Sequence, residues 1–173
     1  AAYSTGKPAL GVGTGNVPSY IEKSAKIKRA ANDVIASKTF DNGMICASEQ
    51  AIIVDKEVYQ EVKNEFQKHS VYFAKPNEVE KFEKSVMNEA KVAVNPDIVG
   101  QAPYTIAELA GVSIPKETKL IVVELNGVGK DYPLSREKLS PVLAMVKAET
   151  TDHAFELSQQ MLELGGLGHS AAI

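Results

Sequence analysis

Cysteine and the aromatic residues are scarce in this sequence, which contains one cysteine, Cys46, and no tryptophan. A single cysteine excludes an internal disulfide and a zinc site built from several cysteines, and it suits a reducing cytoplasm. Aromatic residues make up 6% of the chain, and its 19 basic residues are outnumbered by 22 acidic ones without forming a basic run. Nucleic-acid binding is therefore not expected.

Long apolar runs are also missing, because the longest runs extend over only a few residues. They are far shorter than a membrane span requires, and no secretory signal pattern opens the chain. We therefore expect a cytoplasmic protein without membrane contact. The 173 residues suffice for one domain over 1–173. The chain begins Ala1-Ala2-Tyr3 without methionine and stops in an apolar run, Ser170–Ile173. We expect an internal piece of a longer polypeptide.

Strand-like and helix-like patterns alternate along the chain. Short apolar segments predict strands at Pro8–Val12, Ala51–Val54, Val71–Ala74, Val92–Val94, Lys119–Glu124 and Pro141–Val146. Apolar residues at helical spacing predict helices near 27–38, 58–66, 77–86, 106–110 and 151–164, with Asn77 and Glu80 capping the third and Thr151 or Asp152 the last. This alternation predicts an α/β fold with a largely parallel sheet.

Cys46 lies just beyond a strong turn signal, Asp41-Asn42-Gly43, and shortly before a predicted strand. Backbone N–H groups left free at such a place favour a thiolate and can also hold an oxyanion. Free cysteine is nevertheless among the most frequently buried residue types, so composition alone favours an inert core thiol.

The segment Lys38–Gln50 resembles the catalytic cysteine segment of aldehyde dehydrogenases. Its ending, Ile45-Cys46-Ala47-Ser48-Glu49-Gln50, is similar to that of the bifunctional aldehyde–alcohol dehydrogenases. Further matching segments follow in that family's order: Ser4–Pro8 with the glycine turn after it, Val99–Gln101, Ile106–Gly111, Glu137–Pro141 and Gly166–Ser170. The resemblance covers essentially the whole chain. It implies a three-layer α/β/α catalytic domain, truncated, with the NAD-binding domain and the alcohol dehydrogenase region outside it.

The resemblance also bears on the type of reaction. Hydrolytic aldehyde dehydrogenases carry a glutamate just before a Gly-Lys pair, and this glutamate activates water. The matching pair here is Gly6-Lys7, and no Asp or Glu precedes Glu22. General base catalysis is worth about 10²- to 10⁴-fold, so hydrolysis of an acyl-enzyme should be slow. The acyl group then waits for a better nucleophile, and coenzyme A fits.

His169 and Glu137 receive their expected roles from the same resemblance. His169 follows Gly166-Leu167-Gly168 at the start of an apparent strand, and the family implies a place near the catalytic thiol. There, it could take the proton from the incoming thiol of coenzyme A. Glu137 lies in a Glu-x-x-x-Pro segment, where the family carries a glutamate that contacts the ribose next to the nicotinamide. Without the resemblance, a structural histidine and a surface glutamate remain open readings.

The glycine-rich turn from Gly11 through Gly13 to Asn16 is easily mistaken for a dinucleotide-binding loop. Its spacing is Gly-x-Gly-x-Gly, with Pro18 close behind, whereas that loop needs G-x-G-x-x-G opening a helix. A tight structural turn is one reading. The resemblance places the turn in the catalytic domain at the substrate or coenzyme A entrance, so Gly11, Gly13 and Asn16 are candidate cofactor-binding residues.

The implied reaction is the NAD-dependent, CoA-acylating oxidation of acetaldehyde. Cys46 forms a thiohemiacetal, hydride passes to NAD, and coenzyme A takes the acyl group from the resulting thioester. In fermentation to ethanol the family runs the reverse reaction, the reduction of acetyl-CoA. No metal is expected in this chain, and iron belongs only to the absent alcohol dehydrogenase region. The partners are a small aldehyde and acyl-CoA, and the family implies homo-oligomers or helical filaments.

Three alternatives stay open at this point. The first is a monofunctional CoA-acylating aldehyde dehydrogenase without the alcohol dehydrogenase region. The second is a cysteine hydrolase that uses Cys46 and His169 and needs neither NAD nor coenzyme A. The third is a non-enzymatic α/β interaction module with a buried thiol.

Overall fold

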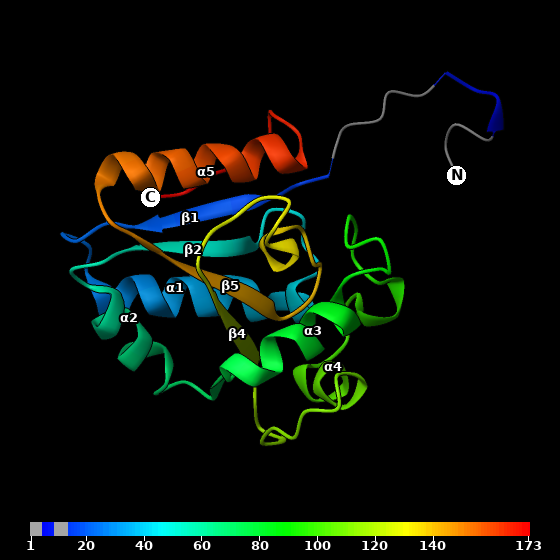
Figure 1. The fold of residues 1–173 in the computed structure, drawn as a ribbon, viewed down its shortest axis with the longest axis horizontal. Helices are drawn as coiled ribbons and strands as arrows, with labels where there is room; N and C mark the ends of the chain where they lie inside the picture. The colour runs from blue at the N-terminus through cyan, green and yellow to red at the C-terminus, as the bar shows by residue number, and fades with distance from the viewer. Residues whose placement is uncertain (1–4, 9–13) are drawn as a thin grey trace.

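The computed structural model describes residues 5–8 and 14–173. Its centre is a parallel sheet with the strand order β1-β2-β5-β4-β3 (Figure 1). The strands are β1 (Val17–Ile21), β2 (Glu49–Asp55), β3 (Val71–Phe73), β4 (Leu120–Leu125) and β5 (Val142–Ala148). The predicted α/β class and the parallel sheet are confirmed.

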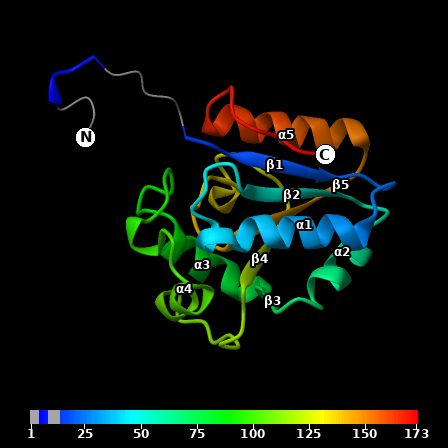
Figure 2. The ribbon, with the colours of Figure 1, turned by 180° about the vertical axis from the view of Figure 1, so that it is seen from behind.

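Helices cover both faces of this sheet and complete three layers. They are α1 (Ile27–Thr39), α2 (Tyr59–Phe66), α3 (Val79–Val86), α4 (Pro103–Leu109) and α5 (Thr151–Gly165). α1 and α2 share one core with the sheet, and α3, α4 and α5 pack on the other face. α3 lies in front of the sheet in Figure 1, and α1 lies in front of it in Figure 2, the view from behind.

The alternation of side chains along the strands explains this layering. On β2, Ile52 and Val54 point into the core with α1 and α2, while Ala51 and Ile53 point into the core with α5. All four side chains are fully buried. Strands apolar on both faces are typical of parallel sheets covered by helices on both sides.

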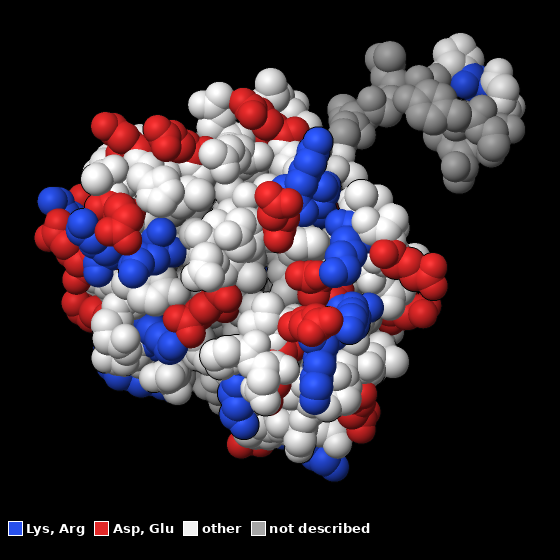
Figure 3. Space-filling view, in the orientation of Figure 1, with Lys and Arg blue, Asp and Glu red and all other residues white. Residues whose placement is uncertain are grey.

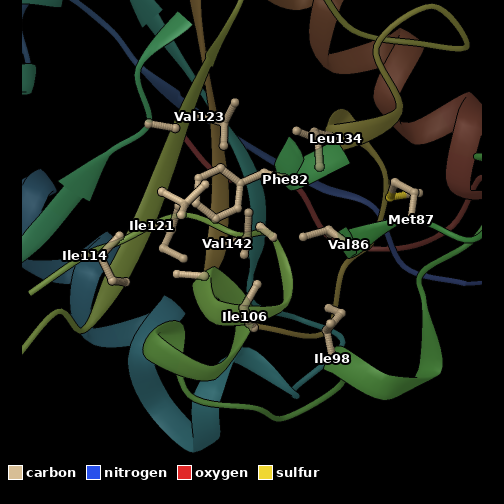
Figure 4. Close-up of a cluster of buried hydrophobic side chains, with 14 residues drawn as sticks. Phe82, Val86, Met87, Ile98, Ile106, Ile114, Ile121, Val123, Leu134 and Val142 are labelled. Atoms are coloured by element: carbon tan, nitrogen blue, oxygen red, sulfur yellow. The ribbon is translucent and has the colours of Figure 1, made fainter. Parts of the chain in front are cut away.

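Leu134 anchors the connection before β5 in the core beneath α3 and α4. It belongs to the short 3₁₀ helix η5 (Pro133–Ser135) and is 1% exposed. Figure 4 shows it in the cluster that also holds Phe82, Val86 and Val142. Three further 3₁₀ turns are η2 (Phe40–Gly43), η3 (Pro76–Glu78) and η4 (Pro96–Ile98).

The structure differs from the sequence prediction at two strands. The prediction of a strand at Val92–Val94 is wrong. Val92 is 59% exposed, and within this segment only Val94 forms an isolated bridge, to Met87. β1 was not predicted, since Pro18 and Ser19 interrupt its apolar pattern. The predicted strand Pro8–Val12 lies largely outside the described residues.

Two predicted helix caps are also corrected. α5 is capped by Thr150, whose Oγ1 accepts a hydrogen bond from the His153 N–H at 3.1 Å, and not by Thr151 or Asp152. α3 begins after η3, where the Glu78 carboxylate accepts the Lys75 N–H at 2.9 Å, so Asn77 and Glu80 form no cap. Each cap lies one or two residues earlier in the chain than predicted, because several polar side chains near each helix start can act as the acceptor.

Candidate active site

The candidate site residues that the structure describes each lie shortly before a parallel strand or bridge. Asn16 precedes β1, Cys46 precedes β2 and Glu137 precedes β5, and these three strands are neighbours in the sheet. His169 precedes Ala172, which forms a parallel bridge with Ser19 on the other side of β1. Because parallel strands start at the same edge of a sheet, the four segments meet at its amino-terminal edge. Most open α/β sheets bind ligands at the opposite edge.

The Cys46 loop is shaped by consecutive left-handed residues. Asp41, Asn42 and Gly43 have φ of 48°, 49° and 69°, conformations that Asn, Asp and Gly adopt most readily. The Asn42 side-chain amide donates to the Gly100 carbonyl oxygen at 2.9 Å, which ties the loop to a neighbouring connection. Cys46 is exposed. The alternative of a buried, inert thiol is therefore wrong.

Gly15 is the point at which the candidate residues converge. A Cβ atom at Gly15 would lie 2.8 Å from Nε2 of His169 and 2.9 Å from the carbonyl oxygen of Cys46. The backbone N–H of Gly15 also interacts with the Glu137 carboxylate. The close approach of these three candidate residues requires a glycine here. The sequence prediction missed Gly15, although it is the last glycine of the Gly-x-Gly-x-Gly turn.

His169 is partly exposed, and its ring nitrogens have different partners. Nδ1 accepts a hydrogen bond from the Ser170 backbone N–H at 2.9 Å, while Nε2 faces Gly15. A nitrogen that accepts an N–H carries no proton, so the neutral ring in this geometry is protonated at Nε2. His169 therefore directs a donor into the site as it stands.

Glu137 is partly buried beside Gly15. Burial raises the pKa of the Glu137 carboxyl, while the hydrogen bond from the Gly15 N–H and the nearby Lys38 and Lys138 act in the opposite direction. Its carboxylate is an acceptor-only group that can receive the hydroxyl groups of a sugar. The residue present is thus compatible with the ribose contact that the family resemblance implies, and this role stays a prediction.

The remaining predicted cofactor residues occupy the glycine turn. Gly11 and Gly13 lie outside the described residues. Asn16 is 1% exposed, and its Nδ2 donates to the Met161 carbonyl oxygen of α5 at 2.9 Å. Its Oδ1 is buried and has no hydrogen-bond partner among residues 5–8 and 14–173, and Asn16 lines a cavity of about 90 Å³ together with Glu137. The cofactor role of this turn stays a prediction.

Two lysines beside the site are fully buried, Lys38 at the end of α1 and Lys138 directly after Glu137. The sequence prediction did not single out either of them. Lys38 could have been found, because it continues the helical spacing of the buried face of α1 after Val34 and Ile35. Lys138 carries no such signal, since it lies in an irregular connection.

A cavity of about 740 Å³ lies between β1 and α1, and neither Cys46, Glu137 nor His169 lines it. Within the described ranges, no helix has the length and apolar character needed to cross a bilayer. The same residues contain no group of three or more His, Cys, Asp or Glu side chains that could hold a metal ion.

On the face seen in Figure 3, basic side chains are interspersed with acidic ones.

The fold and the site together define a class: a three-layer α/β domain that presents one reachable cysteine beside a histidine and a glutamate. The aldehyde dehydrogenase family model matches residues 1–161. The chain therefore belongs to the aldehyde dehydrogenase family.

Individual relatives narrow the resemblance. The chain is 51% identical over 185 residues to an aldehyde-alcohol dehydrogenase of Streptococcus pneumoniae, in a match that covers all of this chain and 20% of that relative. An acetylating aldehyde dehydrogenase of Geobacillus thermoglucosidasius is 49% identical with a TM-score of 0.90, over 98% of this chain and 37% of that one. A propionaldehyde dehydrogenase of Rhodopseudomonas palustris, solved with bound CoA and an acylated cysteine, is 28% identical with a TM-score of 0.78, over 94% and 36%.

Proposed function

We propose that this chain carries the acyl-accepting thiol, Cys46, of a CoA-acylating aldehyde dehydrogenase. The observation that carries the proposal is the exposed Cys46 in a segment whose backbone meets His169 and Glu137 around Gly15. The printed names of the relatives support it, above all the R. palustris enzyme with its acylated cysteine. Because the chain spans a fifth of its S. pneumoniae relative, the activity belongs to a longer parent protein.

The first step takes place at the sulfur. The Cys46 thiolate adds to the carbonyl carbon of acetaldehyde, and the carbonyl π electrons move to oxygen, which gives the oxyanion of a thiohemiacetal. Within the described residues, the Cys46 N–H donates to no protein acceptor, so it is free to hold the oxyanion. One such donor is worth about 3 kcal/mol.

Oxidation turns this adduct into a thioester. NAD, when bound, supplies the acceptor for the two electrons. Glu137 would hold its ribose, and the turn of Gly11, Gly13 and Asn16 would line the entrance to the site. An ionised carboxylate accepts hydroxyl groups more strongly than a neutral carboxyl group does. The Gly15 N–H and the two lysines, which act against the effect of burial on the Glu137 pKa, therefore support this role.

Transfer to coenzyme A requires the removal of a thiol proton. We assign this to His169, whose Nε2 faces the site. The neutral ring must first release the Ser170 N–H and move its own proton from Nε2 to Nδ1. The CoA thiolate then attacks the thioester carbonyl carbon, and the Cys46 thiolate leaves. The absence of an acidic residue before Glu22 slows the competing attack by water.

The test is made on the full-length parent protein. We expect acetyl-CoA-dependent oxidation of NADH, the reverse direction, and its loss in Cys46→Ser. Iodoacetamide should label Cys46 at neutral pH, and acyl-CoA should protect it. Activity retained in Cys46→Ser removes this thiol from the mechanism. Thioester hydrolysis without NAD or coenzyme A would favour the cysteine hydrolase instead.

The identity to an aldehyde-alcohol dehydrogenase favours a bifunctional parent. Such a parent should also reduce acetaldehyde to ethanol with NADH, and an iron chelator should abolish only this second activity. A parent that lacks it is monofunctional. We further propose a cytoplasmic homo-oligomer or helical filament, which electron microscopy of the purified parent would reveal.

A further inference from the structure

Two buried cations lie directly beneath the candidate site. Lys38 and Lys138 are both 0% exposed, whereas lysine is almost never fully buried without a partner. The hydrogen bonds of both ammonium groups go to neutral oxygen atoms. Burying two like charges side by side is unfavourable, so their presence next to Glu137 requires a reason.

The Lys138 side chain is held by backbone carbonyl groups. Its Nζ donates to the carbonyl oxygens of Gln50, Leu134 and Arg136, each at 2.8 Å. Three acceptors match the three N–H groups of an ammonium, whereas a neutral amine would direct a lone pair at one carbonyl. Burial lowers the pKa of Lys138, but the carbonyl groups stabilise the cation. Its bonds attach the segment before Glu137 to β2.

Gln50 connects the two lysines. Its Oε1 accepts from Lys38 Nζ at 3.2 Å and from the Lys138 backbone N–H at 3.0 Å, and its Nε2 donates to the Ser48 carbonyl oxygen at 3.1 Å. One buried amide thus joins the end of α1, the segment after Cys46 and the segment after Glu137. We call Lys38, Gln50 and Lys138 the lysine layer.

The Cys46 loop rests on this layer. At Gly43, a Cβ atom would lie 2.6 Å from the Ser140 carbonyl oxygen and 3.0 Å from that of Lys38. The loop therefore contacts the backbone next to both lysines without room for a side chain. The placement of Cys46 relative to Glu137 depends on these contacts, since the two residues lie in different connections of the sheet.

Electrostatic contacts link Lys38 to Glu137. Burial lowers the pKa of Lys38 to about 7, and the charges of Glu49 on β2 and Glu137 oppose this shift. Burial raises the pKa of Glu137, and the nearby Lys38 and Lys138 act to lower it. The charged groups that face Lys38 are therefore Glu49, Glu137 and Lys138, and Lys38 changes its own charge near neutral pH.

We propose that the lysine layer positions Glu137 against the Cys46 loop and that the charge of Lys38 keeps the Glu137 carboxylate ionised for cofactor binding. This inference rests on the proposed contact of Glu137 with NAD. It makes Lys38 a positioning residue, because it acts through Glu137. Its charge should matter below pH 7 and lose its effect when Lys38 is neutral.

The test uses Lys38→Met in the full-length parent, with NADH kinetics at pH 6.5 and 8.5. We expect the KM for NADH to rise at pH 6.5 by up to about threefold, the largest change that a shift of half a pKa unit in Glu137 can produce. At pH 8.5 it should equal that of the wild type, since Lys38 is then neutral, and kcat should change little. Lys38→Gln keeps an N–H donor toward Gln50 without the charge, and it serves the same comparison if Lys38→Met does not fold.

Two controls separate the possible outcomes. Lys28 lies on an exposed part of the same helix, so the Lys28→Met variant should have the KM for NADH of the wild type at both pH values. In Glu137→Gln, adding Lys38→Met should change nothing further, because a double-mutant cycle isolates the coupling. A KM that is unchanged at both pH values, even with a lower Tm, overturns the inference. If Cys46→Ser stays active, the proposed function fails instead.

Discussion

Replacing Gly15 with alanine adds a single carbon atom at the place where His169, Cys46 and Glu137 approach one another. The substitution therefore tests whether activity depends on this close approach. The added Cβ would lie 2.8 Å from His169 Nε2 and 2.9 Å from the Cys46 carbonyl oxygen, about 0.6 Å and 0.5 Å short of ordinary contact at 3.4 Å. The φ angle of Gly15 is outside the left-handed region, so the backbone accepts alanine and the effect is purely steric. The histidine ring or the Cys46 loop must move.

A displacement of this size should lower the rate rather than unfold the protein. A misplacement of about 1 Å can cost about 10²-fold in rate, so we expect kcat for acetyl-CoA-dependent NADH oxidation to fall by about that factor. Iodoacetamide labelling of Cys46 should continue, because the thiol is exposed independently of Gly15. Stopped-flow or steady-state NADH absorbance measures the first effect, and mass spectrometry measures the second.

The matched control is Gly111→Ala. Gly111 has a φ of +62° and nothing within 4 Å of its Cβ position, so alanine there strains the backbone without touching the site. It should lower stability by about 1 kcal/mol and leave kcat unchanged. If Gly15→Ala keeps kcat within about twofold of the wild type, catalysis does not depend on how Cys46, His169 and Glu137 are placed around Gly15, and the reasoning is refuted.

Three further predictions concern charge and stability. Glu137→Gln should raise the KM for NADH about tenfold, the order expected for a lost hydrogen bond to a charged group. Iodoacetamide labelling of Cys46 should not change. Unchanged NADH kinetics would contradict the cofactor role of Glu137. Lys38 binds its proton more weakly in the folded protein, with a pKa of about 7, than in the unfolded chain, so stability should rise with pH above 7 by up to about 1.4 kcal/mol per unit. Urea unfolding of the parent from pH 7 to 9 should show this slope in the wild type and a flatter one in Lys38→Met, and parallel slopes would contradict it. Thr150→Ala removes the acceptor for the His153 N–H and should cost about 1 kcal/mol, seen as a lower Tm with unchanged kcat.

Much of the fold was predictable because its signals are local. The helical spacing from Ile27 onward predicted α1, and the apolar residues of Ala51–Val54 predicted β2, since both patterns need only neighbours in the chain. β1 was not predicted because Pro18 and Ser19 interrupt its apolar pattern. Both residues are buried only because the sheet packs around them. Val92–Val94 failed for the opposite reason, as apolar residues without a neighbouring strand stay exposed.

The site was only partly predictable. Cys46 was found from its turn and from family resemblance, and the structure adds that the thiol is exposed. Gly15 and Lys138 were missed because their importance lies in contacts with residues far away in the chain, such as His169 for Gly15 and Gln50 for Lys138. No periodicity records such contacts.

By itself, the sequence determined the helices, most strands, the α/β class and the placement of a lone cysteine after a turn. These follow from local backbone preferences and from the burial of apolar residues at regular spacing. Only the tertiary structure decided that Gly15, Cys46, Glu137 and His169 meet, because strand order brings the starts of β1, β2 and β5 to one edge. It also decided that Lys38 is buried next to a carboxylate, since the environment of a charge depends on every segment packed around it.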